Sequence, residues 1–429
     1  MTGFRYFPQE LRLPGFDAKW LMMYKVSPPF SQASEELSLS GVRFVLFVFL
    51  LTRAGIFALA YLAEIALPSN TDPIFSWHTA PNIIILDVMA RFDSAFYLQI
   101  IEQGYSCNAA PPRNLGFFPL YPLLVSLFGA TTPVQRVAAG VFVSNLLFLG
   151  ALILLYKLVL FEWKDSSAAR RTVFYMAIAP GSVFFCAVYT ESLFLFLFVA
   201  LFYAIRCERW YWATLFAMLL PVTRMQGILA PPILVLGWMY AHGWALRGLF
   251  SAQMWRPFAG QLRGDWPQFF LLLLSFSLLL SHLYSLQVHC GDFLALYKAQ
   301  IVGFQHAIRG PGAVLWNSMS YLYHCDFKTG IVNVNALLEV AVILFSLMMA
   351  VPVFSKLGTV YGIFTLASVL LPITSMTAGF VRYYSVIFPI IMVLGALGRV
   401  EAVDRAVVVA TFLLLAFGTV LFANGYFFM

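Results

Sequence analysis

The sequence predicts an all-α fold, a bundle of about eleven helices that crosses a membrane repeatedly and carries polar loops outside it. Of the 429 residues, 61% are hydrophobic and only 10% are charged, whereas soluble domains are roughly 45–50% apolar and 25% charged. Apolar runs of about 17–25 residues, the length that crosses about 30 Å of hydrocarbon, recur from Gly41 to the C-terminus. A water-facing fold could not cover that much apolar surface.

The apolar runs divide the chain into a cytoplasmic N-terminal segment and a transmembrane domain. Residues 1–41 mix charged residues, proline and aromatics without an apolar stretch, so no cleavable signal peptide is expected. Residues 42–429 are expected to form the transmembrane domain. Its spans are predicted at 42–66, 136–158, 172–188, 190–205, 210–223, 227–241, 267–288, 333–354, 358–374, 382–398 and 406–424.

Two of these spans form a hairpin in our interpretation, and one span contains an unusual charge. A single helix from Thr172 to Ile205 would be about 50 Å long, too long for a simple crossing. Glu191 lies in its middle, where a charge in lipid costs roughly 2.5–3.5 kcal/mol, so a turn there is expected. Arg53 lies about halfway through the first span. Either it faces a protein or water-filled cavity, where it could meet a phosphate, or the span begins later.

The distribution of Lys and Arg predicts the orientation. The loops on the N-terminal side carry about twice as many of these residues as the opposite loops, which makes that side cytoplasmic. The formal charge of +7 therefore reflects membrane anchoring, and we expect no nucleic-acid partner. On the other side, the loops at about 68–135 and 289–332 are too long to be simple connectors, and such loops commonly carry binding and catalysis.

The cysteines and histidines predict no metal site and no cofactor. Three of the five cysteines, Cys107, Cys290 and Cys325, fall in the outer loops, which leaves room for one disulfide whose pairing stays open. No two cysteines have the spacing of metal ligands. The six histidines lack an H-E-x-x-H arrangement.

Charged residues from five different loops fall at the outer face. Carboxylates can deprotonate a nucleophile, and guanidinium groups can neutralise an anionic leaving group, so such a set is suited to group transfer at a membrane surface. The alternative is that each is an ordinary solvated residue. The set consists of Arg91, Asp93, Glu102, Glu191, Arg224, Asp292 and Arg382.

Several motifs resemble, in order, those of the GPI mannosyltransferase 2 (PIG-V) family. The first outer loop contains RFDSAFYL at 91–98, EQGY at 102–105 and FFPLYP at 117–122, similar to the first outer loop of that family. Phe92 stands where the family usually has Trp, and Gln103 where some members have His. The later matches are VSNL at 143–146, YTESLF at 189–194, TRMQG at 223–227, Gly291-Asp292 with Gln300, and Arg382-Tyr383 with Phe388-Pro389.

This resemblance implies a GT-C-like glycosyltransferase. Such enzymes use polyprenyl- or dolichyl-phosphate sugars on the non-cytoplasmic side. This implies an inverting single displacement onto a glycan or glycolipid acceptor. Mannose is the sugar expected to be transferred, with another hexose as the second choice. The chain is short for a eukaryotic member, so a bacterial plasma membrane is expected rather than the ER membrane. Bacteria do not build GPI anchors, so the acceptor is not carried over from the family.

Within this resemblance, Asp93 is the expected catalytic base. It would take the proton of the acceptor hydroxyl as the anomeric carbon becomes electrophilic. Alternatively, Asp93 only caps the helix expected to follow it. Asp87 is a second candidate base, in an apolar turn without a matching motif.

The remaining site residues are expected to bind the phosphate-linked donor. Arg224 and Arg382 are the main phosphate ligands because guanidinium binds phosphate through paired, charge-assisted hydrogen bonds. Their alternative role is snorkelling to the membrane interface. Glu191 either orients the acceptor, pairs with one of these arginines, or marks a turn. Arg91, Asp292 and Tyr383 complete the predicted donor-binding set.

Two other function classes remain open at this point. A transporter or lipid flippase would use the same hydrophobic bundle, but it usually places charges near mid-bilayer in several spans. A non-catalytic assembly subunit would tolerate the loss of Asp93, whereas an enzyme would not.

Overall fold

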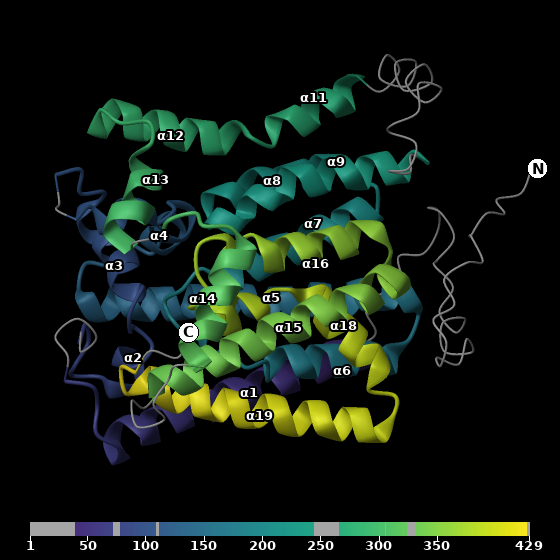
Figure 1. Cartoon of the computed structure of the whole chain (residues 1–429), viewed down its shortest axis with the longest axis horizontal. Coiled ribbons are helices and arrows are strands. Elements are labelled where there is room, and N and C mark those ends of the chain that lie inside the picture. The colour runs from purple at the N-terminus through teal and green to yellow at the C-terminus, as the bar shows by residue number, and fades with distance from the viewer. Residues whose placement is uncertain are drawn as a thin grey trace, which may run out of the picture.

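The computed structural model describes residues 39–71, 78–108, 111–243, 266–304, 306–323 and 331–426. Within these ranges all regular structure is helical, which confirms the predicted all-α bundle. The long helices run side by side along the longest axis, and the short helices α2, α3, α4 and α13 gather at one end (Figure 1). Cys325 and residues 1–38, most of the predicted N-terminal segment, lie outside the described residues.

The helices follow the apolar runs, and each predicted span overlaps at least one of them. The helices of the bundle are α1 (Leu39–Ala66), α5 (Pro133–Trp163), α6 (Ser166–Ala177), α7 (Glu191–Arg206), α8 (Trp210–Leu219), α9 (Ala230–Ala241), α11 (Trp266–Leu274), α12 (Ser277–Cys290), α15 (Ile331–Leu357), α16 (Thr359–Leu370), α18 (Phe388–Leu397) and α19 (Glu401–Ala423).

The bundle has the surface of a multi-pass membrane protein. Among the described residues, five helical segments are long and apolar enough to cross a bilayer by themselves: 39–66, 133–163, 270–290, 335–357 and 401–423. Large apolar side chains on the outer helices are exposed, such as Leu50 on α1 at 64% and Leu413 on α19 at 63%. Exposed apolar surface of this extent suits contact with lipid. The number of eleven crossings stays a prediction.

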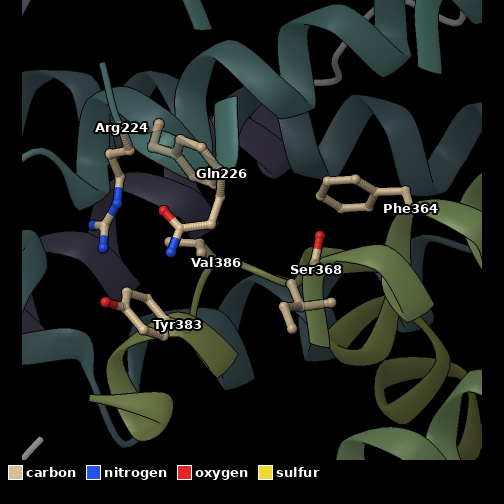
Figure 2. A pocket seen from close by; sticks show the side chains of 8 residues that line it. Arg224, Gln226, Phe364, Ser368, Tyr383 and Val386 are labelled. Carbon is tan, nitrogen blue, oxygen red and sulfur yellow. The ribbon is translucent and has the colours of Figure 1, made fainter. Parts of the chain in front are cut away.

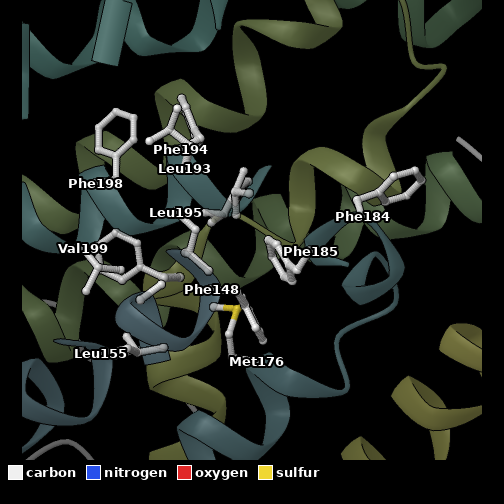
Figure 3. Packing of buried hydrophobic residues seen from close by; sticks show 14 of the residues in the cluster. Phe148, Leu155, Met176, Phe184, Phe185, Leu193, Phe194, Leu195, Phe198 and Val199 are labelled. Atoms are coloured by element: carbon white, nitrogen blue, oxygen red, sulfur yellow. The ribbon is translucent and has the colours of Figure 1, made fainter. Parts of the chain in front are cut away.

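An aromatic core packs α5, α6 and α7 together. Phe148 of α5 stacks on Phe185 at 4.4 Å between ring centroids, and Phe194 and Phe198 of α7 lie 4.8 Å apart (Figure 3). These rings are buried, so the first residues of α7 are held by a close-packed neighbourhood. Because α7 begins at Glu191, this packing also fixes the position of Glu191.

The chain breaks between α6 and α7, as the hairpin interpretation predicts. Helix α6 ends at Ala177, and only a short 3-10 turn at Ser182–Phe185 precedes α7. Arg53 of α1 is buried at this break and donates hydrogen bonds to the Ala177 carbonyl (2.9 Å) and to the Ser182 hydroxyl (2.7 Å). The open question about Arg53 is thereby answered. It satisfies carbonyl groups that the interrupted helix leaves unpaired.

The two long outer segments, which were expected to be more than simple connectors, fold into short helices. These are α2 (Ile84–Asp87), α3 (Ser94–Gln103), α4 (Leu120–Ser126), α13 (Ala295–Lys298) and α14 (Pro311–Tyr323). A small apolar cluster joins the two segments: Leu115 and Phe118 of the first pack with Leu286 and Leu296. A disulfide between Cys107 and Cys290, with Cα atoms 5.2 Å apart, also links them. Both segments therefore lie on the same side of the bundle.

Candidate active site

A cavity of about 660 Å³ opens where the two outer segments meet the helix ends. Its lining includes five of the predicted site residues: Asp93, Glu191, Arg224, Arg382 and Tyr383. They come from the starts of α3 and α7, from the turn after α8, and from the short helix α17 (Phe380–Tyr384). Residues far apart in sequence thus line one cavity at the end of the bundle where the two outer segments lie.

Four of these residues form a chain of alternating charges. Arg382 Nη1 lies 2.6 Å from Asp93 Oδ2, and Arg382 Nε lies 3.0 Å from Glu191 Oε1. The same Glu191 oxygen contacts Arg224 Nη1. The Glu191 side chain is 1% exposed and the Asp93 side chain 27%, so Asp93 is the carboxylate that a substrate can reach.

Asp93 does not cap α3 through its side chain. It occupies the N-cap position, but its carboxylate makes no capping hydrogen bond and is directed to Arg382. Phe92, just before it, has φ of +53°, a left-handed conformation that is costly for a bulky residue. The Tyr189 hydroxyl accepts from the Asp93 amide (3.2 Å) and donates to the Arg91 carbonyl (3.2 Å), which holds this backbone in place.

Arg382 is positioned by a carboxylate of α15. Gly379 precedes α17 with φ of +89°, a conformation that favours glycine, and its amide donates to Glu339 Oε1 at 2.9 Å. Glu339 is buried, so this bond is shielded from water. The turn that carries Arg382 is therefore anchored to a long membrane helix.

Arg224 depends on a close backbone approach in the TRMQG segment. A Cβ atom on Gly227 would lie 1.9 Å from the Leu220 carbonyl oxygen, so only glycine fits there. The Arg224 guanidinium lies 5.3 Å from the Tyr383 ring centroid, and the Arg382 guanidinium lies at the same distance from that ring. Figure 2 shows Arg224, Gln226 and Tyr383 facing a small adjoining pocket. Tyr383 thus orients both arginines.

Arg91 has a different position from the one expected for a donor ligand. Its guanidinium is 2% exposed and lies 3.0 Å from Glu64 Oε1 and 3.1 Å from Asp87 Oδ2. Asp87 in turn accepts from the Ala80 amide at 2.7 Å. Neither Arg91 nor Asp87 is among the described residues that line the cavity. Both belong to a buried ion-pair cluster that supports the turn before α3.

Asp292 also lies away from the charge chain. Its carboxylate is 2.7 Å from Lys298 Nζ and accepts from the Leu294 amide at 3.0 Å. The hydrogen bond from Lys298 lowers the pKa of Asp292. Asp292 therefore stabilises the start of its own segment, and the described cavity lining does not contain it.

The cavity has an aromatic wall and polar groups that the motifs did not single out. Phe96 stacks on Phe117 at 4.8 Å, and Phe304 lies edge-on to both at 5.8 Å. Such ring faces suit the C–H faces of a sugar. Additional polar lining residues include Arg113, Gln226, Gln300 and His306. Gln226 lies within the TRMQG segment and Gln300 ends the Gly291-Asp292 motif, whereas Arg113 and His306 carried no sequence signal.

Positive charge in the cavity comes from guanidinium groups. Among the residues that the structure describes, no cluster of three His, Cys, Asp or Glu side chains is arranged to hold a metal ion. Arg224 and Arg382 face the same space as Asp93. Two guanidinium groups beside an accessible carboxylate are suited to binding a phosphate next to a proton acceptor.

Comparison with known proteins identifies the family. Residues 42–255 match the family model described as Mannosyltransferase (PIG-V). The chain belongs to this mannosyltransferase family. No curated relative matches the chain. The matched region of this PIG-V-family chain contains Asp93, Glu191 and Arg224, whereas Arg382 comes from beyond it. The protein is therefore a multi-pass membrane glycosyltransferase, whose partners are a sugar donor and a glycan acceptor.

Proposed function

We propose that this protein transfers mannose from polyprenyl- or dolichyl-phosphate mannose to a hydroxyl of a lipid-linked glycan or glycolipid, on the non-cytoplasmic side and with inversion. The observation that carries the proposal is Arg382, which bridges Asp93 and Glu191 within one cavity beside Arg224. A second polyprenyl-phosphate hexose is the alternative donor. Residues 42–429 act as one transmembrane domain in this proposal, because the cavity takes residues from both halves.

In the proposed reaction, the donor phosphate binds Arg224 and Arg382. Asp93 accepts the proton of the acceptor hydroxyl as its oxygen attacks the anomeric carbon from the face opposite the phosphate. The bond between that carbon and the phosphate oxygen breaks, and the guanidinium groups stabilise the charge on the departing lipid phosphate. One accessible carboxylate without a nucleophilic partner supports one displacement, which inverts the anomeric configuration.

The disulfide supports the sidedness of the site. Cys107 lies in the first outer segment and Cys290 at the start of the second, and disulfides persist in oxidising compartments but are rare in the cytosol. Nucleotide sugars are cytoplasmic, so a donor on the other side must arrive on a lipid that has crossed the bilayer. A transporter usually needs charges near mid-bilayer, whereas Arg53 donates to the Ala177 carbonyl and is not among the described residues of the cavity lining.

A donor panel tests the function. The purified protein, with octyl α-mannoside as acceptor probe, should transfer label from polyprenyl- or dolichyl-phosphate mannose and not from GDP-mannose. Transfer should persist in EDTA, because guanidinium groups neutralise the leaving phosphate. NMR of the product should show an inverted linkage. Turnover with GDP-mannose alone, or strict dependence on a divalent cation, would contradict the proposal.

Cysteine accessibility tests the side. In a chain with Cys186, Cys207 and Cys325 replaced by serine, Lys298→Cys should react with an impermeant maleimide added to intact cells. Its position is 60% exposed in the outer segment. Arg405→Cys, at the 74% exposed start of α19, should react only after permeabilisation. The reverse pattern would place the cavity in the cytoplasm and favour a nucleotide-sugar donor.

A further inference from the structure

His306 lines the same cavity but takes no part in the reaction proposed above. It follows the short π-helical turn Ala299–Gly303 and is half-buried. Its ring lies 5.7 Å from that of Phe304, at the aromatic wall. A histidine in this place offers the cavity a hydrogen-bonding group that is neither a carboxylate nor a guanidinium.

A relay of hydrogen bonds determines which ring nitrogen carries the proton. The Gln300 amide nitrogen donates to the Gly116 carbonyl at 2.8 Å, so its oxygen is the atom that lies 2.9 Å from His306 Nδ1. A carbonyl oxygen can only accept, and Nδ1 must therefore carry the hydrogen. In the neutral ring, Nε2 is then left as a hydrogen-bond acceptor.

The surroundings keep the ring neutral. Burial lowers the pKa of His306, the Arg382 charge lowers it further, and the Asp93 charge opposes them. These two charged residues come from the start of α3 and from α17, and both line the same cavity as the ring. An acceptor hydroxyl that reaches Asp93 in this cavity would therefore share it with His306.

Gly116 allows the relay to form. A Cβ atom at this position would lie 2.9 Å from Gln300 Nε2 and 3.3 Å from the Phe304 ring, so a larger residue would displace the amide. The Gln300 side chain is thus held between a backbone carbonyl of the first outer segment and a histidine of the second.

We propose that His306 Nε2 accepts a hydrogen bond from a hydroxyl of the acceptor sugar, and that Gln300 is the positioning residue that fixes the required tautomer. The inference rests on the proposed function, and it identifies the acceptor as a polyhydroxylated sugar rather than a simple alcohol. Glu191 is engaged by both arginines, and Asp93 is assigned to the attacking hydroxyl, so His306 Nε2 is available to another hydroxyl of the sugar. The sugar would stack on the Phe96–Phe117 wall while His306 selects its hydroxyl orientation.

The test measures the effects on the acceptor and on the donor separately, with the full-length chain. With polyprenyl-phosphate mannose as donor and octyl α-mannoside as acceptor probe, His306→Ala should raise the acceptor KM about tenfold, the usual effect of one lost hydrogen bond. Binding of labelled donor should be unchanged. His289→Ala, an exposed histidine at the end of α12, is the matched control and should leave both values unchanged.

A pH profile reports the tautomer relay directly. The wild-type kcat/KM should fall as the pH drops through the lowered pKa of His306, because protonation removes the acceptor at Nε2. Gln300→Glu places a carboxylate against Nδ1 and favours the charged ring, so this acid limb should move up by about one to two pH units. In the double variant Gln300→Glu/His306→Gln the limb should not move.

An unchanged acceptor KM in His306→Ala, or an unmoved acid limb in Gln300→Glu, would overturn this inference while the proposed function stands. Thermal unfolding in detergent confirms that each variant is folded before it is compared. Failure of the wild-type chain to transfer mannose from the lipid-phosphate donor would overturn both.

Discussion

Replacing Asp93 by asparagine should lower kcat at least ~100-fold, the usual contribution of a positioned base. Asparagine has nearly the same shape, and its carbonyl can still accept from Arg382 Nη1, which lies 2.6 Å from the carboxylate. It cannot take a proton from the acceptor. Donor binding should therefore stay close to the wild-type value. Steady-state transfer from polyprenyl-phosphate mannose, with thermal unfolding measured in parallel, checks both expectations.

A matched control for this substitution lies at the same end of the bundle. Glu102 forms an ion pair with Arg136 at 2.7 Å, and the described cavity lining contains neither residue. Glu102→Gln should change turnover by no more than about twofold, since the Glu102 side chain is 49% exposed and lies outside the described cavity lining. Asp87→Asn tests the second candidate base. This variant should lower stability rather than kcat per folded molecule, because Asp87 forms an ion pair with Arg91. Near-normal turnover of Asp93→Asn would refute the base assignment.

Replacing Arg382 by alanine should weaken donor binding by roughly 2–5 kcal/mol, the cost of removing one partner of a buried charge pair. This corresponds to a loss of donor affinity of about 30-fold or more. Arg382 contacts both Asp93 and Glu191, so the variant also leaves Glu191 with Arg224 alone. Arg224→Ala should act in the same direction. Retention of labelled polyprenyl-phosphate mannose on the immobilised protein measures the effect.

Lysine substitutions distinguish phosphate binding from membrane anchoring. Arg382→Lys should restore donor affinity only in part, because an ammonium group cannot form the planar paired contact with phosphate. Arg136→Ala is the control, since Arg136 is an equally shielded arginine in an ion pair outside the described lining. Complete rescue by lysine, or unchanged affinity in Arg382→Ala, would indicate that the arginine only snorkels to the interface.

The helices were predictable because membrane insertion is a local property of the sequence. A run such as 133–163 has to be helical in lipid, where every backbone group needs an internal partner. The break before α7 was predictable for the same reason, since Glu191 cannot lie in hydrocarbon without cost. Apart from the helix expected after Asp93, the short helices of the outer segments were missed. Their apolar residues are too few for a strong signal and are buried against other segments, as Leu115 is against Leu286.

The sequence marked most of the charged residues that line the cavity, but not how they are arranged. Asp93, Glu191, Arg224, Arg382 and Tyr383 do share one cavity, and the motifs had marked all five. Arg91 was marked by the same motif as Asp93, yet its side chain is turned to Glu64 of α1. Asp292 satisfies its charge with Lys298, a partner six residues away.

Composition and motif order by themselves determined that this chain is an α-helical membrane protein of the mannosyltransferase family, with carboxylates and arginines in its outer segments. Which of these charges meet was decided only by the tertiary structure. Arg382 reaches Asp93 across 289 residues of sequence, and Gln300 reaches Gly116 across 184. Contacts of that range depend on how the helices pack, and neither hydrophobic periodicity nor local propensity encodes the packing. For the same reason the His306 tautomer becomes apparent only when the two outer segments are placed together.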